Sequence, residues 1–209
     1  MYIKNVAANI WDIRSTDPDP AAEFLVDTNA WYFTTYTRAS ILAVGQPKKY
    51  QTQQYSRFIK RALDAGSILH RCDLSLAELS HAIEECERRI FIEFIAKRDV
   101  PMKEYRHCED EERKQVVSEI ESAWGQITEM SRCLGLSIQG PTTESALSDL
   151  KSCPIDGYDV LLLQAMKQGK LTSIITDDSD FATVPGIEVF TCNPDLIQLA
   201  GKQGHLREN

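Results

Sequence analysis

The stretch Ile174-Ile175-Thr176-Asp177-Asp178-Ser179-Asp180-Phe181 decides the expected fold, because an apolar, β-branched run leads directly into a group of carboxylates. Such a run is typical of a buried parallel strand, and α/β sheets hold their sites outside the carboxyl ends of such strands. Carboxylates this close together repel one another, so a fold that gathers them binds a divalent cation or lets them separate into water. For this octapeptide alone, a solvated turn is the alternative.

The composition limits the classes of protein to consider. The chain has 209 residues, 43% of them hydrophobic, which suits one α/β domain with or without an insertion. No apolar run reaches the ~18 residues of a membrane helix, and no signal-peptide pattern is present, so we expect a cytoplasmic protein without a membrane partner. The net charge of -8 argues against a protein that coats nucleic acid by bulk charge, although a local basic face stays compatible with it.

Short apolar runs alternate with helical patterns along the chain. Residues 1–23 contain Asp17-Pro18-Asp19-Pro20 and show no clean period, so we interpret them as an N-terminal arm before a single domain over 24–209. We expect strands near 24–26, 67–70, 136–138, 172–176 and 187–190, and helices near 28–44, 51–65, 75–97, 103–134, 142–150, 156–168 and from 193 onward. This alternation predicts an α/β fold with a central, mainly parallel sheet between helical layers.

The two longest predicted helices follow one another and suggest a helical hairpin inserted over about 75–134. Each carries an apolar stripe at intervals of three or four residues: Leu76, Leu79, Ile83, Cys86, Ile90 and Phe94 on the first, and Val116, Ile120, Trp124, Ile127, Met130 and Leu134 on the second. We expect the stripes to be buried within the chain. A surface for an oligomer or another protein is the alternative.

Acidic side chains stand at the ends of several predicted elements, where a parallel sheet would let them converge. They are Asp27 after a strand, Glu78 and Asp159 in first helical turns, and the cluster Asp177, Asp178 and Asp180. Carboxylates suit Mg²⁺ or Mn²⁺, and the six cysteines, at least 14 positions apart, offer no CxxC pair for zinc.

Two of these acidic positions have a structural alternative. Ser75-Leu76-Ala77-Glu78 also fits a capping box, and Asp156-Gly157-Tyr158-Asp159 fits an N-cap followed by a first-turn carboxylate. Asp27 is harder to explain, since a buried strand seldom ends in a charge without a cap, an ion pair or a metal.

Four motifs in order along residues 24–195 resemble those of PIN-domain nucleases. They are Phe24-Leu25-Val26-Asp27-Thr28-Asn29, Ser75-Leu76-Ala77-Glu78, Asp159-Val160-Leu161-Leu162-Leu163-Gln164-Ala165 and Thr176-Asp177-Asp178-Ser179-Asp180-Phe181. The resemblance implies a three-layer α/β/α fold and Mg²⁺- or Mn²⁺-dependent hydrolysis of phosphodiester bonds, most often in RNA, as in the toxins of bacterial toxin–antitoxin pairs. The 81 positions from Glu78 to Asp159 and residues 1–23 depart from the small members, so substrate and partner stay open.

From these residues we predict a metal-dependent nuclease that cleaves single-stranded RNA. Its catalytic metal ligands are Asp27, Glu78, Asp159 and Asp178, with Asp180 in support. Thr28, Asn29 and Thr176 are expected to orient the carboxylates by hydrogen bonds. Asp177 lies at the variable position of the motif, and Asp156 is expected to cap a helix. An antitoxin or another protein partner, and a homodimer, are left open.

The segment 28–63 is the expected path of the substrate. It holds no acidic residue and carries +6 inside a chain of -8. Aromatic residues at 50, 55 and 58 lie among its cations, a mixture that suits single-stranded nucleic acid. The predicted substrate contacts are Lys48, Lys49, Arg57, Lys60 and Arg61. An ordinary solvated helix face is the alternative.

Two other classes of function stay open. One is a PIN-like module of weak or no activity whose inserted hairpin binds a protein, although no carboxylate of the motifs is missing. The other is a phosphohydrolase of small molecules. An aspartyl-nucleophile phosphatase would need a second Asp two positions after Asp27, where this chain has Asn29.

Overall fold

A single parallel sheet forms the centre of the protein in the computed structural model, which describes residues 4–42 and 45–208. The described strands have the order β4-β3-β2-β5-β6-β1-β7, and each pairs in parallel with its neighbours. They are β1 (Asn9–Asp12), β2 (Glu23–Val26), β3 (Ile68–Cys72), β4 (Arg132–Leu134), β5 (Ser173–Ile175), β6 (Glu188–Thr191) and β7 (Leu206–Arg207). The predicted α/β fold with a parallel sheet is confirmed.

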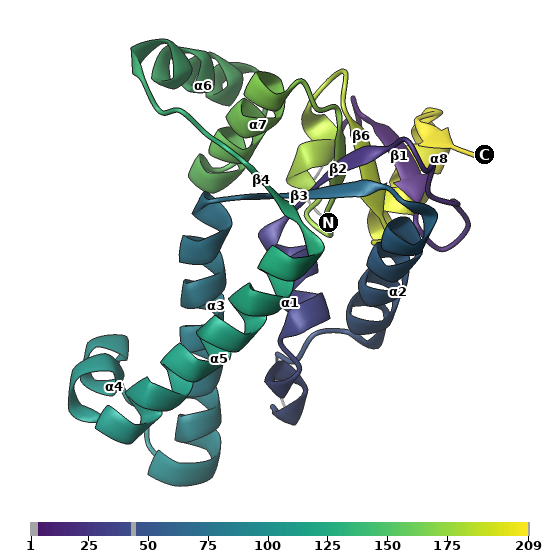
Figure 1. Ribbon diagram of the computed structural model, residues 1–209. Coiled ribbons are helices and arrows are strands. Elements are labelled where there is room, and N and C mark those ends of the chain that lie inside the picture. The colour runs from purple at the N-terminus through teal and green to yellow at the C-terminus, as the bar shows by residue number, and fades with distance from the viewer. Residues whose placement is uncertain (1–3, 43–44, 209) are drawn as a thin grey trace.

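Helices cover both faces of the sheet (Figure 1). One layer holds α1 (Thr28–Thr35), α2 (Lys49–Ala65), α3 (Leu74–Phe91) and α5 (Asp110–Met130), and the other holds α6 (Gly140–Ser152), α7 (Gly157–Gly169) and α8 (Pro194–Gln203). Strand alternation explains the two cores: Phe24 and Val26 of β2 point into the first, and Leu25 points into the second. None of the described helices is long and apolar enough to cross a membrane.

The predicted helical hairpin extends away from the sheet as α3 and α5, with α4 (Met102–Cys108) at its far end (Figure 1). Val116 and Ile127 on α5 are buried, and Ile120 and Trp124 pack against the same cores. The apolar stripe of the second long helix is therefore covered by the chain itself, as expected.

Three elements of this region differ from the prediction. The first long helix continues beyond Phe91 as a π-helical turn (Ile92–Ala96), whose wider spacing takes Phe94 off the buried stripe and leaves it 49% exposed. The stretch 103–134 is not one helix, because the backbone leaves helical geometry at Glu109 and again at Ser131. The strand expected at 136–138 is instead β4 at 132–134, which pairs with β3.

Other bounds differ more modestly. The helix expected over 28–44 ends at Thr35 and is followed by a 3₁₀ turn (Arg38–Ile41), and its predicted end at Val44 lies outside the described residues. A second 3₁₀ turn covers Asp180–Thr183. The segment interpreted as an arm contributes β1, which lies between β6 and β7. Only Ile10 of its four residues is fully buried, so the sequence offered no continuous apolar run to detect.

Candidate metal centre

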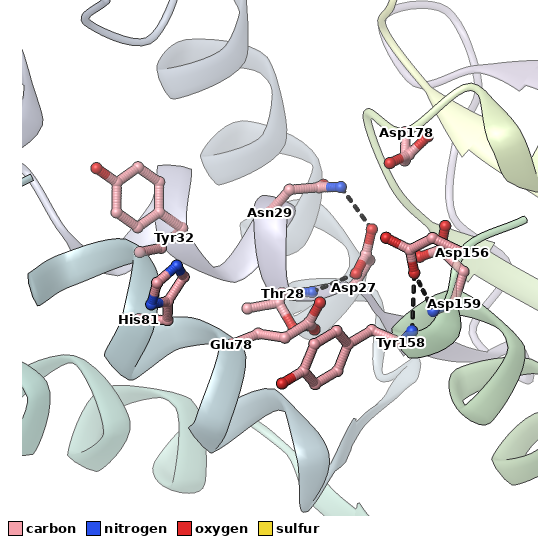
Figure 2. Close-up of a pocket in the computed structure, with 11 residues that line it drawn as sticks. Asp27, Thr28, Asn29, Tyr32, Glu78, His81, Asp156, Tyr158, Asp159 and Asp178 are labelled. Carbon is pink, nitrogen blue, oxygen red and sulfur yellow. Dashed lines mark hydrogen bonds between the residues drawn. The ribbon is translucent and has the colours of Figure 1, made fainter. Parts of the chain in front are cut away.

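Acidic side chains converge in a pocket of about 370 Å³ outside the carboxyl edge of the sheet (Figure 2). β2 and β5 are neighbours, so Asp27 and Asp178, which follow them in the chain, are brought to the same edge. Asp159 reaches the pocket from the first turn of α7, and Glu78 reaches it from α3. The structure thus brings four sequence-predicted ligands, Asp27, Glu78, Asp159 and Asp178, to the wall of one cavity.

Asp27 is held by hydrogen bonds from the residues expected to orient it. Its Oδ1 accepts a hydrogen bond from the backbone nitrogen of Thr28 at 2.6 Å. Through this hydrogen bond Asp27 also caps the N-terminus of α1. Its Oδ2 accepts from Asn29 Nδ2 and from Thr176 Oγ1, the latter at 2.6 Å. Burial nevertheless raises the pKa of Asp27 to about 7, and the nearby carboxylates of Glu78 and Asp178 add to the rise. The fold therefore fixes the orientation of this carboxylate but gives it no positively charged partner among the described residues.

Asp159, Asp178 and Asp180 form the tightest acidic group among the described residues. One carboxylate oxygen from each lies within 4.8 Å of the other two. The pKa of Asp159 is raised to about 8, first by burial and then by the charges of Asp27 and Asp178. Three hard oxygen donors under mutual repulsion fit a divalent cation such as Mg²⁺ or Mn²⁺.

Glu78 lines the same pocket from α3 and is not part of this group of three. Its Oε2 accepts a hydrogen bond from Thr28 Oγ1 at 2.5 Å. Ser75 and Glu78 do not form the capping box that was the alternative. Helix α3 begins at Leu74, and the Ser75 hydroxyl has no described hydrogen-bond partner. Burial raises the pKa of Glu78, and the charges of Asp156 and Asp178 add to the rise.

Two neighbouring carboxylates, Asp156 before the third motif and Asp177 within the fourth, make structural contacts. Asp156 caps α7 by accepting from the backbone nitrogens of Tyr158 and Asp159, as expected, and it also lines the pocket (Figure 2). Asp177 points to α2 instead, where its carboxylate accepts from Gln51 Nε2 at 2.6 Å and lies 2.9 Å from the Tyr55 hydroxyl.

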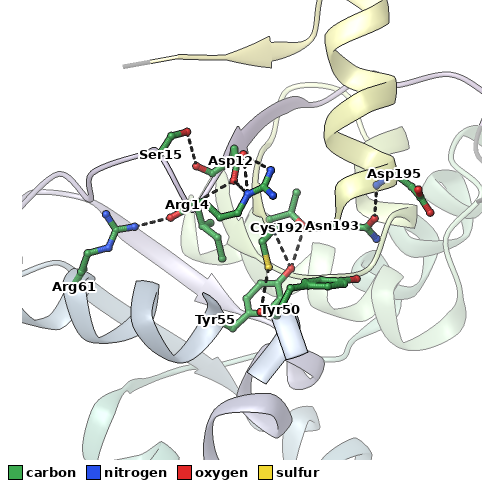
Figure 3. Close-up of polar contacts among 11 residues, drawn as sticks. Asp12, Arg14, Ser15, Tyr50, Tyr55, Arg61, Cys192, Asn193 and Asp195 are labelled. Carbon is green, nitrogen blue, oxygen red and sulfur yellow. Dashed lines mark hydrogen bonds and ion pairs between the residues drawn. The ribbon is translucent and has the colours of Figure 1, made fainter. Parts of the chain in front are cut away.

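Tyr55 anchors the strand end from which the acidic loop leaves. Its buried hydroxyl lies 3.0 Å from the Thr176 carbonyl oxygen and 3.0 Å from Thr191 Oγ1, and accepts a hydrogen bond from the backbone nitrogen of Cys192 (Figure 3). These contacts join α2 to the ends of β5 and β6. The loop that carries Asp178 and Asp180 is thereby held against a rigid frame.

Besides Ala82, the pocket is lined by three residues with ring side chains that the sequence analysis did not single out: Tyr32, His81 and Tyr158. Helical spacing could have found two of them. His81 stands three positions after Glu78 and Tyr32 four positions after Thr28, so each shares a helix face with a residue already singled out.

The predicted substrate contacts on α2 fall into two groups. Lys48 and Lys49 are exposed at its start, next to residues 50 and 51 that contact Asp177. Arg57, Lys60 and Arg61 lie further along the helix. Lys60 pairs with Asp64, while Arg61 pairs with Asp17 and donates to the Ile13 carbonyl oxygen, so both already have intramolecular partners (Figure 3).

Fold and site together define an α/β protein with an acidic pocket at the carboxyl edge of a parallel sheet. The structure is similar to a chain in the crystal structure of VapBC2 from Rickettsia felis bound to a DNA fragment from their promoter, with a TM-score of 0.48 and 11% sequence identity over 81% of this chain and 98% of that chain. No protein-family model and no curated protein matches the sequence.

Proposed function

We propose that this protein is a Mg²⁺- or Mn²⁺-dependent nuclease that hydrolyses phosphodiester bonds, with single-stranded RNA as its substrate. The observation that carries the proposal is the convergence of Asp27, Glu78, Asp159 and Asp178 on one pocket. The carboxylates come from separate elements, and in the described part of the chain none of these four is in an ion pair.

Asp159, Asp178 and Asp180 are the proposed ligands of the cation, and Asp27 and Glu78 complete the acidic wall. A bound divalent cation supplies charge stabilisation to the scissile phosphate and activation of water. Thr28, Asn29 and Thr176 hold Asp27 in one orientation, so its carboxylate needs no rearrangement on binding. No side chain has to act as a covalent nucleophile.

Incubation of the purified protein with labelled single-stranded RNA and DNA, in Mg²⁺, Mn²⁺ or EDTA, tests the proposal. We expect cleavage of RNA that EDTA stops and that Asp178→Asn abolishes. Glu144→Gln is the matched control, because it removes one negative charge from an exposed position on α6 and should leave cleavage unchanged. RNA that stays intact with either cation, or an Asp178→Asn protein that cuts at the wild-type rate, would contradict the proposal.

A further inference from the structure

The pocket has two chemically different ends. Asp159 and Asp178 lie toward one end and Tyr32 of α1 and His81 of α3 lie toward the other, with Glu78 and the ring of Tyr158 of α7 between them in the view of Figure 2. The three rings come from three separate helices: Tyr158 directly precedes Asp159, His81 lies one helical turn after Glu78, and Tyr32 lies one turn after Thr28. No Lys or Arg is among the described residues that line the cavity.

Tyr32 and Tyr158 differ in how they are held. The ring of Tyr32 packs against Tyr36 at 5.2 Å and Phe33 at 6.0 Å between centroids, so it forms a fixed wall. Tyr158 is 47% exposed although it stands directly before Asp159. Among the described residues, its ring has no aromatic partner and its hydroxyl no hydrogen bond. Only its backbone nitrogen is fixed, by Asp156.

His81 likewise presents a polar group with no described hydrogen bond. It is exposed and lines the cavity one helical turn after Glu78. A neutral imidazole has one donor and one acceptor nitrogen, and a tyrosine hydroxyl does both, so this end of the pocket offers polar tips as well as π faces.

We propose that Tyr158, His81 and Tyr32 form a subsite for one unstacked nucleobase next to the scissile phosphate. The inference rests on the proposed nuclease function. It deepens that function by defining the substrate as a nucleotide whose base is free to leave a stack, as in single strands and loops.

The charge of the pocket favours a base over a second phosphate at this end. The lining lacks cations among its described residues and holds five carboxylates, Asp27, Glu78, Asp156, Asp159 and Asp178, so a phosphate away from the bound cation would be repelled. A nucleobase is neutral, stacks on aromatic rings and forms hydrogen bonds along its edge. The volume of about 370 Å³ lies in the range of small-ligand sites, roughly 300–1,000 Å³.

Nucleoside monophosphates that carry a fluorescent purine analogue test the subsite, because the protein cannot cleave them further. In Mg²⁺ we expect wild-type protein to quench the fluorophore, Tyr158→Ala to bind about tenfold more weakly, and Tyr158→Phe to retain binding because the ring remains. His81→Ala should weaken binding and change the preference among bases. Phe94→Ala is the matched control, since Phe94 is 49% exposed at the far tip of the hairpin and should bind as wild type does.

A further arm separates recognition of the base from recognition of the phosphate. Ribose 5-phosphate lacks the base, so wild type and Tyr158→Ala should bind it equally. Unchanged nucleotide affinity in Tyr158→Ala, or equal wild-type affinity for ribose 5-phosphate and nucleotide, would overturn the base subsite.

The outcomes also distinguish this inference from the proposed function. Nucleotide binding that depends on Tyr158, together with intact RNA in the cleavage assay, would leave the subsite in place and reject the nuclease. Metal-dependent cleavage with an unchanged Tyr158→Ala affinity would do the reverse.

Discussion

Two pairs of buried carboxylates in this protein have opposite surroundings. Glu84 and Glu87 on the hairpin are 5% and 1% exposed, and Asp27 and Asp159 at the pocket are 4% and 7% exposed. Burial alone therefore does not distinguish the two pairs. The difference lies in the charges around them.

On the hairpin, arginine side chains neutralise both glutamates. Glu84 binds Arg106 and Arg113, and the hydrogen bond from Arg106 is the largest cause of its lowered pKa. Glu87 accepts from Arg38 Nε at 2.6 Å and from the Tyr36 hydroxyl at 2.6 Å. These contacts join α3 to the segment after α1 and to the hairpin tip, so the charges serve the architecture.

At the pocket, neither Asp27 nor Asp159 has an ion pair in the described chain, and both pKa values are raised, to about 7 and about 8. A fold that keeps such groups loses stability at neutral pH, because it opposes an ionisation that both carboxyl groups undergo freely in the unfolded chain. A buried carboxylate without a counter-charge therefore indicates function more strongly than burial or acidity does.

Removal of one pocket charge should have the largest effect. Asp159→Asn is expected to reduce metal-dependent cleavage by more than about 100-fold. Loss of a residue that only supports a metal ligand costs up to about 100-fold, and loss of a ligand itself should cost more. It should also stabilise the metal-free protein by about 2 kcal/mol at pH 8. The sign follows from linkage: a raised carboxyl pKa produces a penalty that is absent below the unfolded pKa and grows as pH rises toward the folded pKa of about 8.

Thermal unfolding in EDTA and single-turnover cleavage in Mn²⁺ measure the two effects. Asp27→Asn should lose cleavage as well but gain less stability, because its two oxygens accept hydrogen bonds from Thr28, Asn29 and Thr176. If Asp159→Asn were no more stable than wild type, the buried Asp159 carboxyl would not destabilise the fold, and the contrast with the hairpin glutamates would be wrong.

The same substitution type on the hairpin should have the opposite sign. Glu87→Gln removes the charge that Arg38 binds and weakens the contact with Tyr36, so we expect a loss of about 2 kcal/mol in the free energy of unfolding, measured by urea denaturation at pH 7. Cleavage by the folded variant should be unchanged. Glu129→Gln controls for the loss of one negative charge, because Glu129 is exposed near the C-terminal end of α5. A Glu87→Gln protein that is more stable than wild type would remove the distinction between the two regions.

The pH dependence of the hairpin pair sharpens the contrast at smaller amplitude. Because the pKa of Glu84 is lowered, its ion pairs stabilise the fold above its ordinary value of 4.5, and this contribution disappears as pH falls through the folded pKa. The partners are half-exposed, so we expect about 1 kcal/mol or less. Glu84→Gln should therefore be less stable than wild type at about pH 7, and the difference should shrink as the pH falls below 4.5. A constant difference across that range would contradict the assignment.

Much of the fold was predictable because the deciding signals are local. The run 174–176 before the acidic cluster, and Phe24-Leu25-Val26 before Asp27, indicated the two central strands, and strand adjacency then followed from the parallel architecture. The short edge elements were missed: β7 has two residues and depends on pairing with β1. The displaced β4 shows the same limit, since Leu134 is buried by contact with its neighbours, whereas Ile138, equally apolar, is 53% exposed.

The candidate site divides in a similar way. Its carboxylates follow element ends and could be found from order and spacing. Tyr158 and His81 belong to no recognisable motif. Their importance follows from tertiary structure, because only the fold brings α7 and α3 to the same cavity. The partners of Asp177 on α2 were equally hidden, since Tyr55 is 122 residues away in sequence.

The smallest expected effect concerns the two lysines at the start of α2. The acidic pocket repels an RNA backbone beyond the bound cation, so we predict that binding uses Lys48 and Lys49, which are exposed beside the segment that contacts Asp177. Replacement of both by Ala should weaken RNA binding and reduce the slope of log K against log salt by about one for each phosphate that is no longer neutralised, with little change in cleavage at saturating RNA.

Lys60→Ala with Arg61→Ala is the matched control. It removes the same charge from the same helix, but Lys60 already pairs with Asp64 and Arg61 with Asp17. Binding titrations over a range of salt concentrations compare the two double variants. If they lower the slope equally, the effect is one of net charge on α2 and the two lysines have no special role. A reduced slope in the first variant alone would fix the direction in which the RNA leaves the pocket.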